Sequence, residues 1–411
     1  MSVEVLNPIL HALIELLPAP SVTSGRLSGW TFAIKDNTDI QGVAKTDGLG
    51  PPLPRPAVRD AEVVRRLRAA GATIVGTANL EELSFGATTQ NPVWGACRNP
   101  WDLQRIPGGS SGGSAVAVAA GLVRAALGTD TGGSLRNPAA FCGVSALRPS
   151  HGLVPTLGVT PLSPSMDVVG PIAQSVEDLG TVLEVLVGGP LRPAAGDLAG
   201  LAVGVPSTYF LDDLEPAVAH GFDAFLELLT RCGARIVVLT DLGDVDAVHA
   251  AMAALQNSEA VRGLQPYWDD PRVSDGIRGR IEAGRAVTTD EIEKAAAVAA
   301  RWRTAVDNAL QDVDVIAVPA TPFVAPVAAA DDLTQLSRRI NRLTGSWSLT
   351  GTPVLALPTA PAPSGLPVGV QLVGGRGADG RVLAIGERIQ RESDWHLRSP
   401  DVLGQVSRAA T

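Results

Sequence analysis

The sequence predicts an α/β fold of three layers, in which helices cover both faces of a large mixed, mostly parallel central sheet. Short apolar runs alternate along the whole chain with segments of helical periodicity, which is the pattern of such folds. The 411 residues are 45% apolar and 18% charged, so the chain can bury a large core. The 44 glycines and 31 prolines follow no period and indicate many tight loops between the elements.

The first half of the chain contains two or three expected strands and three expected helices. The strands are short apolar runs at residues 30–34 and 72–75, and residues 122–127 are either a third strand or a continuation of the apolar core. The helices are expected at residues 61–70, 114–120 and 175–187. We expect Asp60 to cap the first of these helices and Gly71 to end it.

The second half of the chain continues this alternation. Apolar runs bounded by proline and glycine predict strands at residues 201–205, 236–239, 313–318, 354–357 and 368–373. Helices are expected at residues 216–232 and 289–310. A linker at residues 189–200 and a loop at residues 325–332 are too short to separate independent domains. Residues 1–411 are therefore expected to form a single domain.

Charge and cysteine content argue against several classes of partner. The formal net charge of −9 disfavours a nucleic acid or an anionic membrane held by bulk charge. The three cysteines form no C-x-x-C pair, which favours a reducing cytoplasm over a disulfide framework or a zinc site. The N-terminus lacks the basic segment of a signal peptide, and the longest apolar run, residues 115–123, is too short to cross a membrane. We expect a cytoplasmic protein without a metal or a membrane partner.

Two segments rich in glycine and serine carry the densest chemistry, at residues 108–114 and 128–136. The first precedes a helix, where small residues let backbone N–H groups approach a ligand closely. The second places consecutive glycines before Ser134, and free N–H groups beside a hydroxyl are what an oxyanion hole requires. Asp130 and Arg136 flank this serine and are expected to pair and hold the loop.

Two interpretations of this chemistry are weak. Residues 108–112 contain G-x-S-x-G, the pattern of an α/β-hydrolase esterase with Ser110 as nucleophile. However, residues 104–107 are a poor strand, and the histidines after His151 lie in helical or terminal polar segments. A phosphate-binding loop lacks its G-x-x-x-x-G-K-[ST] motif, and the G-x-G-x-x-G that begins at Gly375 lies close to the C-terminus. We expect the latter to be a strand-to-helix turn.

The third interpretation rests on a resemblance. The segments PGGSSGGS at residues 107–114 and GTDTGGSLR at residues 128–136 resemble the signature of the amidase signature family. Further matching positions are residues 32–37, 60–76, 79, 99–101, 115–121, 138–139, 141–143, 152, 161–162, 167, 169–171 and 367–372. The resemblance implies the α/β fold of that family, hydrolysis of a linear amide, and no cofactor.

The resemblance also implies roles for individual residues. Ser134 would be the nucleophile that forms an acyl-enzyme, Ser110 the bridging serine after a cis peptide bond, and Lys35 the base. The oxyanion hole and the substrate site would be formed by the N–H groups of Thr131, Gly132, Gly133 and Ser134 and by the backbone of Ser84.

Lys35 is one of only three lysines among 33 basic residues. An amine can lose its proton and act as a base, whereas a guanidinium does not. To do so near neutral pH, Lys35 needs a pKa lowered by roughly 3 units from about 10.4, which burial can supply. The apolar residues 32–34 favour such burial, and Asp36 is expected to point away.

Several substrates fit the resemblance. Residues 148–152 and 158–161 are similar to plant indole-3-acetamide hydrolase and its bacterial relatives, which predicts a small neutral carboxamide. The alternatives are a glutamine-hydrolysing subunit of a tRNA-dependent amidotransferase and a hydrolase of urea derivatives such as biuret or allophanate. A catalytically silent binding protein is disfavoured because Lys35, Ser110 and Ser134 are intact. A homodimer is expected from the resemblance alone.

Overall fold

An eleven-stranded sheet runs through the computed structural model, which describes residues 3–18, 24–51, 53–191, 198–240, 242–328 and 333–409. Its strand order is β1-β3-β2-β6-β8-β7-β12-β13-β11-β9-β10. The strands are β1 Leu13–Leu16, β2 Thr31–Lys35, β3 Thr73–Ala78, β6 Ala125–Asp130, β7 Ser145–Arg148, β8 Val168–Ala173, β9 Ala202–Pro206, β10 Arg235–Leu239, β11 Val315–Pro319, β12 Val354–Pro358 and β13 Gly369–Val373. A separate hairpin consists of β4 Gln90–Asn91 and β5 Gly95–Ala96. The predicted α/β class with a large mixed sheet is confirmed.

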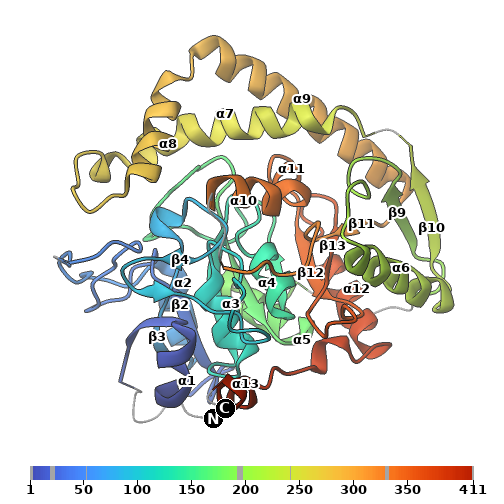
Figure 1. Ribbon diagram of the computed structural model, residues 1–411. Coiled ribbons are helices and arrows are strands. Elements are labelled where there is room, and N and C mark those ends of the chain that lie inside the picture. The colour runs from blue at the N-terminus through green and yellow to red at the C-terminus, as the bar shows by residue number, and fades with distance from the viewer. Residues whose placement is uncertain are drawn as a thin grey trace.

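Helices cover both faces of this sheet (Figure 1). On one face, α2 Glu62–Ala69, α5 Val176–Val187, α6 Pro216–Arg231 and α12 Asp379–Arg391 share one apolar cluster with the strands. On the other face, a second cluster contains residues of α1 Val3–Leu10, α3 Gly112–Ala119, α4 Arg136–Cys142 and α13 Val402–Ala409. The expected three layers are therefore present.

Parallel pairing is found in two groups of three strands, β3-β2-β6 and β11-β9-β10. Within these groups α2 connects β2 to β3 and α6 connects β9 to β10, as parallel neighbours require. The strands between the two groups pair antiparallel. One cause is visible at β12 and β13, which are joined by residues 359–368 without a helix, so the chain simply reverses.

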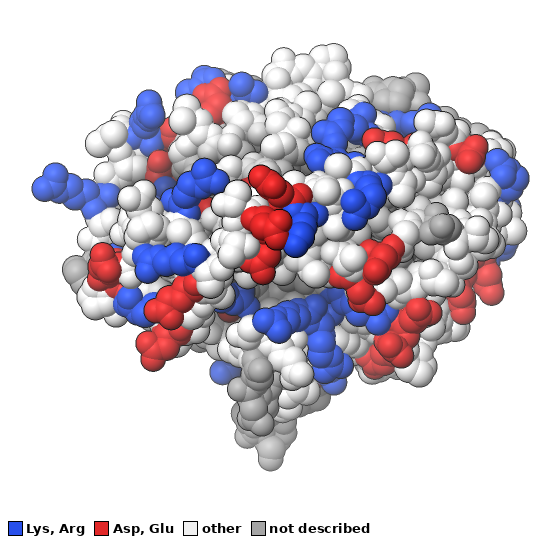
Figure 2. Space-filling view, turned by 90° about the horizontal axis from the view of Figure 1, so that it is seen from above, with Lys and Arg blue, Asp and Glu red and all other residues white. Residues whose placement is uncertain are grey.

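Three helices that we call the cap helices lie across the top of Figure 1, above the rest of the molecule. They are α7 Val245–Gly263, α8 Asp275–Ala286 and α9 Thr289–Asp312. A capping box at Thr288 begins α9. Farther along α9, the indole N–H of Trp302 donates to the carbonyl oxygen of Ser346 at 2.8 Å, which fixes the helix over α11 Gly345–Ser348. Seen from above, charges of both signs are interspersed over this face (Figure 2).

Most predicted elements are present within a few residues of their expected ends, and one predicted cap is wrong. Asp60 does not cap α2, because its carboxylate accepts the N–H of Gln41 at 2.8 Å instead. Gly71 does follow the helix with a positive φ of 89°. Gly375 and Gly377 lie in the expected turn between β13 and α12, and Gly380 lies in the first turn of α12.

Two predicted segments lie partly outside the described residues. They are the expected linker, for residues 192–197, and the expected loop, for residues 329–332. α10, Leu333–Ile340, begins directly after the second gap. Among the described residues, no helix is both long and apolar enough to cross a membrane.

Candidate active site

Lys35 is the last residue of strand β2 and therefore lies at the edge of the sheet where the carboxyl ends of β2 and its parallel neighbours are found. Side chains alternate along a strand, so Phe32 and Ile34 enter the core on one face while Ala33 packs with α3 on the other. By the same alternation Lys35 lies on the α3 side. β2 runs parallel to β6, so the carboxyl ends of both strands meet at this edge, where α/β sheets commonly bind ligands.

Lys35 contacts two hydroxyl groups at this edge. Its Nζ lies 2.7 Å from Oγ of Ser110, which precedes α3, and 2.7 Å from Oγ1 of Thr129, near the end of β6. Lys35 and Ser110 are 0% and 1% exposed. The Gly109–Ser110 peptide bond is cis. The fold thus brings together the expected base and the expected bridging serine, which are 75 residues apart in the chain.

Burial lowers the pKa of Lys35 to about 7, although the carboxylates of Asp130 and Asp167 act in the opposite direction. A large fraction of this amine is therefore neutral near pH 7, and a neutral amine can accept a proton. Asp36 points away as expected, because its carboxylate accepts hydrogen bonds from the backbone N–H and the hydroxyl of Thr46. Burial raises the pKa of Asp36 to about 8, so little negative charge develops beside Lys35 at neutral pH.

The loop after β6 presents Ser134 next to free backbone N–H groups. The carbonyl oxygen of Ser134 accepts the N–H of Ser111 at 3.2 Å, which ties the two glycine-rich segments together. Over residues 131–134 of the described chain, the N–H groups of Thr131, Gly132 and Ser134 donate to no protein acceptor. These three groups remain available to a ligand, as an oxyanion hole requires.

Gly133 departs from its expected role in this loop. Its N–H donates to Oδ1 of Asp130 at 2.9 Å, so it is not free for an oxyanion. The backbone at Gly133 has a φ of 134°, and a Cβ atom there would collide with the hydroxyl of Thr344. Gly133 shapes the loop through its backbone, and three of the four expected donor N–H groups remain without a protein acceptor among the described residues.

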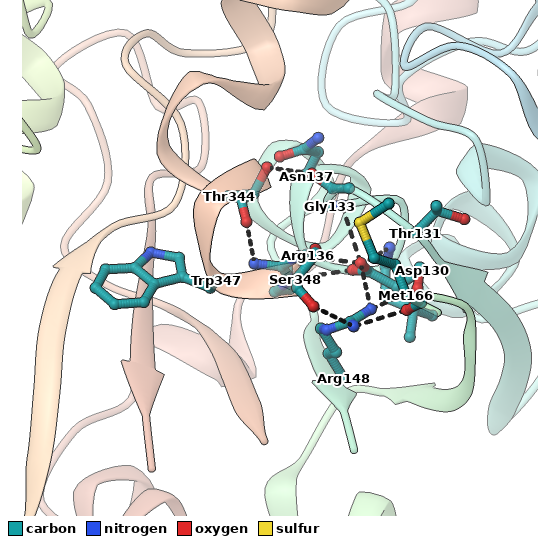
Figure 3. Close-up of polar contacts among 12 residues, drawn as sticks. Asp130, Thr131, Gly133, Arg136, Asn137, Arg148, Met166, Thr344, Trp347 and Ser348 are labelled. Carbon is teal, nitrogen blue, oxygen red and sulfur yellow. Dashed lines mark hydrogen bonds and ion pairs between the residues drawn. The ribbon is translucent and has the colours of Figure 1, made fainter. Parts of the chain in front are cut away.

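Asp130 anchors the loop from within a buried ionic network (Figure 3). Arg136 Nε and Nη2 each donate to its carboxylate at 3.0 Å, so the expected pairing is confirmed. Arg148 adds a bond of 3.1 Å, and Leu135 N–H one of 3.1 Å. Burial alone would raise the pKa of Asp130, but the two guanidinium groups hold it well below its usual range. Gln371 in turn accepts from Arg136 at 2.9 Å, which joins the network to β13.

Replacement of this carboxylate by an amide is expected to destabilise the protein strongly. Asp130→Asn would leave Arg136 and Arg148 buried without their counter-charge, which costs about 3–5 kcal/mol of unfolding free energy. Urea unfolding followed by circular dichroism measures the loss. Asp290→Asn is the matched control, because Asp290 pairs with Lys294 on the exposed face of α9 and such pairs contribute little. Equal unfolding midpoints for the two variants would contradict the anchoring role.

Ser134 lines a cavity of about 520 Å³ between the core and the cap helices. This volume lies within the range of roughly 300–1,000 Å³ typical of small-molecule sites. Ser84 lines the cavity as expected, and the cap helices contribute His249 and Met252 from α7 and Arg280 from α8. The walls therefore combine elements from distant parts of the chain around one serine hydroxyl.

Sequence reasoning missed several contributors to this site. Thr129 lies in the glycine-rich segment at residues 128–136. Its position at the end of a strand, beside Lys35, is the signal that could have identified it as part of the site. Nothing in the sequence around Arg280 points to a binding site. Within the described chain the hydroxyls of Ser110 and Ser134 form no hydrogen bond with each other.

Comparison with known proteins identifies the family of this chain. The model of the Amidase family matches residues 17–383. A glutamyl-tRNA(Gln) amidotransferase subunit from Roseiflexus sp. (strain RS-1) is 36% identical over 415 residues, which cover 92% of this chain and 85% of that protein. A crystal structure of an amidase has a TM-score of 0.85 at 34% identity and covers 94% of both chains. The structure of the glutamyl-tRNA(Gln) amidotransferase subunit from Thermotoga maritima has a TM-score of 0.83 at 31% identity, covering 97% of this chain and 92% of that one. The chain belongs to the amidase signature family of amide hydrolases.

Proposed function

We propose that the protein hydrolyses the C–N bond of a small carboxamide to a carboxylate and ammonia through an acyl-enzyme on Ser134. Ser110 and Lys35 relay the proton, and the N–H groups of Thr131, Gly132 and Ser134 hold the oxyanion. The observation that carries this proposal is the contact of 2.7 Å between a fully buried lysine amine and the Ser110 hydroxyl.

The proton moves in two directions during the reaction. Neutral Lys35 takes the proton of Ser110 as Ser110 takes the proton of Ser134, whose oxygen attacks the amide carbon. When the C–N bond breaks, its electron pair stays on nitrogen, which receives a proton from Ser110. Lys35 returns its proton to Ser110. Water then attacks the acyl carbon while its proton passes through Ser110 to Lys35, and Ser134 receives a proton back along the relay as its bond to that carbon breaks and the carboxylate is released. No residue outside the three named here needs to gain or lose a proton.

A panel of carboxamides tests the proposal. Ammonia release is measured with acetamide, benzamide, indole-3-acetamide, glutamine and biuret. Rapid acid quenching followed by peptide mass spectrometry then locates the acyl group during turnover. We expect release from at least one carboxamide and an acyl mass on the peptide that contains Ser134. An acyl mass on Ser110, or turnover without any acyl-enzyme, would contradict the mechanism.

A second candidate function is hydrolysis of glutamine as one component of a tRNA-dependent amidotransferase. The similar protein from Roseiflexus carries that name. The cavity also contains Arg280 and Arg338 on the side formed by α8 and α10. Arg280 forms no ion pair with any described carboxylate; it donates to the carbonyl oxygen of Phe85 at 2.8 Å and lies over that ring. An anionic group on the substrate would neutralise this positive wall, and glutamine carries a carboxylate.

Arg280→Gln is expected to raise KM for anionic amides, glutamine and succinamate, by about 10–100-fold, since a charge-assisted hydrogen bond contributes about 1.5–3 kcal/mol. KM for acetamide and benzamide should change little. Arg285→Gln serves as the matched control, because Arg285 is an exposed arginine of the same helix that lies over Trp268 and outside the cavity. Equal effects of Arg280→Gln on KM for charged and neutral amides would show that Arg280 is structural. Separately, co-purification of the protein with foreign subunits would favour the amidotransferase function.

A further inference from the structure

A second cavity of about 260 Å³ lies beside the first. The two cavities share one residue, Ser84, and they open on adjacent residues of the loop after β6. Thr131 lines the second cavity, whereas Gly132 and Ser134 line the first. The loop that holds the nucleophile therefore borders both cavities, and the proposed acyl group occupies only one of them.

The polar end of the second cavity is directly connected to the proton relay. Thr129 lines it, and the hydroxyl of Thr129 accepts a hydrogen bond from Lys35 at 2.7 Å. Asn37 also lines it and donates through Nδ2 to Thr129 Oγ1 and to Ser84 Oγ, each at 3.2 Å. One threonine side chain thus separates this cavity from Lys35. The second cavity lies on the side of the site where protons are given and taken.

Apolar side chains form one part of the remaining walls of the second cavity. They are Val154, Val159, Leu162, Val168 and Val169, which come from the segment between β7 and β8 and from β8 itself, and polar residues of the same segment, Thr156, Thr160 and Asp167 among them, line the cavity beside them. Asp167 fixes this segment, because it accepts the hydroxyl of Thr131 at 2.6 Å and the N–H of Leu162 at 2.8 Å. Ammonia and water gain nothing from apolar walls, whereas a short alkyl group gains free energy by leaving water.

We infer that the second cavity binds the amine half of an N-substituted amide, so that the protein hydrolyses secondary amides of small apolar amines. This inference rests on the proposed function. The inference depends on how the substrate divides at the reacting carbon, with an acyl half on one side and an amine half on the other. The acyl half stays with Ser134 in the larger cavity, and the nitrogen must face Ser110, its proton donor, on the Lys35 side. As the C–N bond breaks, nitrogen keeps the electron pair, takes the Ser110 proton and leaves as a neutral amine.

The size of the second cavity limits that amine. Its volume is just below the roughly 300–1,000 Å³ of sites for drug-sized ligands, so it suits a group of a few carbon atoms. N-propyl amides are therefore the probes. Acetamide, benzamide, indole-3-acetamide and glutamine are each compared with the derivative that carries a propyl group on the amide nitrogen. Release of propylamine or ammonia is quantified by chromatography, and kcat/KM is determined for each compound.

Two tryptophan variants in one exposed loop separate the second cavity from its surroundings. Thr156 is exposed and lines the cavity, whereas its exposed neighbour Leu157 does not. We expect the wild type to hydrolyse at least one N-propyl amide with a kcat/KM no lower than that of its unsubstituted parent. Thr156→Trp should lower the ratio of N-propyl to unsubstituted kcat/KM about tenfold or more. Leu157→Trp should leave this ratio unchanged.

The outcomes distinguish this inference from the proposed function. Hydrolysis of unsubstituted amides without any N-propyl hydrolysis overturns the role of the second cavity and leaves the Ser134 mechanism intact. A ratio that Thr156→Trp leaves unchanged has the same consequence. If neither kind of amide is hydrolysed and no acyl group is found on Ser134, the proposed function fails and the inference fails with it.

Discussion

Ser134→Ala is expected to lower kcat for amide hydrolysis by about 10⁴- to 10⁶-fold, the loss typical when a nucleophile is removed from a coupled catalytic group. No other described hydroxyl of the 131–134 loop stands beside the free N–H groups in the larger cavity, so the acyl-enzyme would have no alternative site. Thr131 is turned away, because its hydroxyl donates to Asp167. Ammonia release at saturating amide measures the effect, and circular dichroism checks the fold.

Ser110→Ala should cause a loss of similar size, and the double variant should be no slower than either single variant, because residues that act as a unit are not additive. Ser114→Ala is the matched serine control. Its hydroxyl donates to the carbonyl oxygen of Leu127 inside the core, so we expect activity within a few-fold of wild type. An active Ser134→Ala variant combined with an inactive Ser110→Ala variant would instead support the esterase pattern at residues 108–112.

The parts of the fold that the sequence predicted are those whose signals are local. α5 begins where Ser175 accepts the N–H of Asp178, and its apolar residues recur at helical spacing. α7 escaped prediction because it is rich in alanine and buries few large residues, so its place depends on packing against α8 and α9. α4 was hidden for another reason. All residues of this short helix are buried, Arg136 included, so the sequence shows no alternation of polar and apolar faces at helical spacing.

The candidate site divides in the same way. Lys35, Ser110, Ser134 and Ser84 could all be named from the resemblance to the family, and Ser110 and Ser134 also stand in glycine-rich motifs. The availability of the Gly133 N–H could not be predicted, because it depends on the rotamer of Asp130, which two arginines determine. The arginine side chains that line the larger cavity could also not be predicted from the sequence. Arg280 reaches the cavity only because the cap helices fold back over the loop that contains Phe85.

The titration of Lys35 gives the second large effect. Lys35 acts as a base only when neutral, so kcat/KM should fall as pH decreases through about 7, the value to which burial lowers its pKa. Lys35→Arg keeps the charge but cannot lose a proton, and Lys35→Met has no base, so both should lose about 10⁴-fold or more in kcat. Lys294→Arg is the control, because Lys294 is an exposed lysine on α9.

A stability measurement separates a neutral buried amine from a merely structural lysine. Between about pH 7 and pH 10 the unfolded chain holds a proton on Lys35 that the folded chain lacks. The unfolded state then binds more protons, so the free energy of unfolding rises with pH, by about 1.4 kcal/mol per pH unit from this group. Other buried groups also titrate in this range, so the quantity to compare is the difference between wild type and Lys35→Met. That difference should change by several kcal/mol across the window, whereas equal slopes for the two proteins would mean that Lys35 stays charged and cannot be the base.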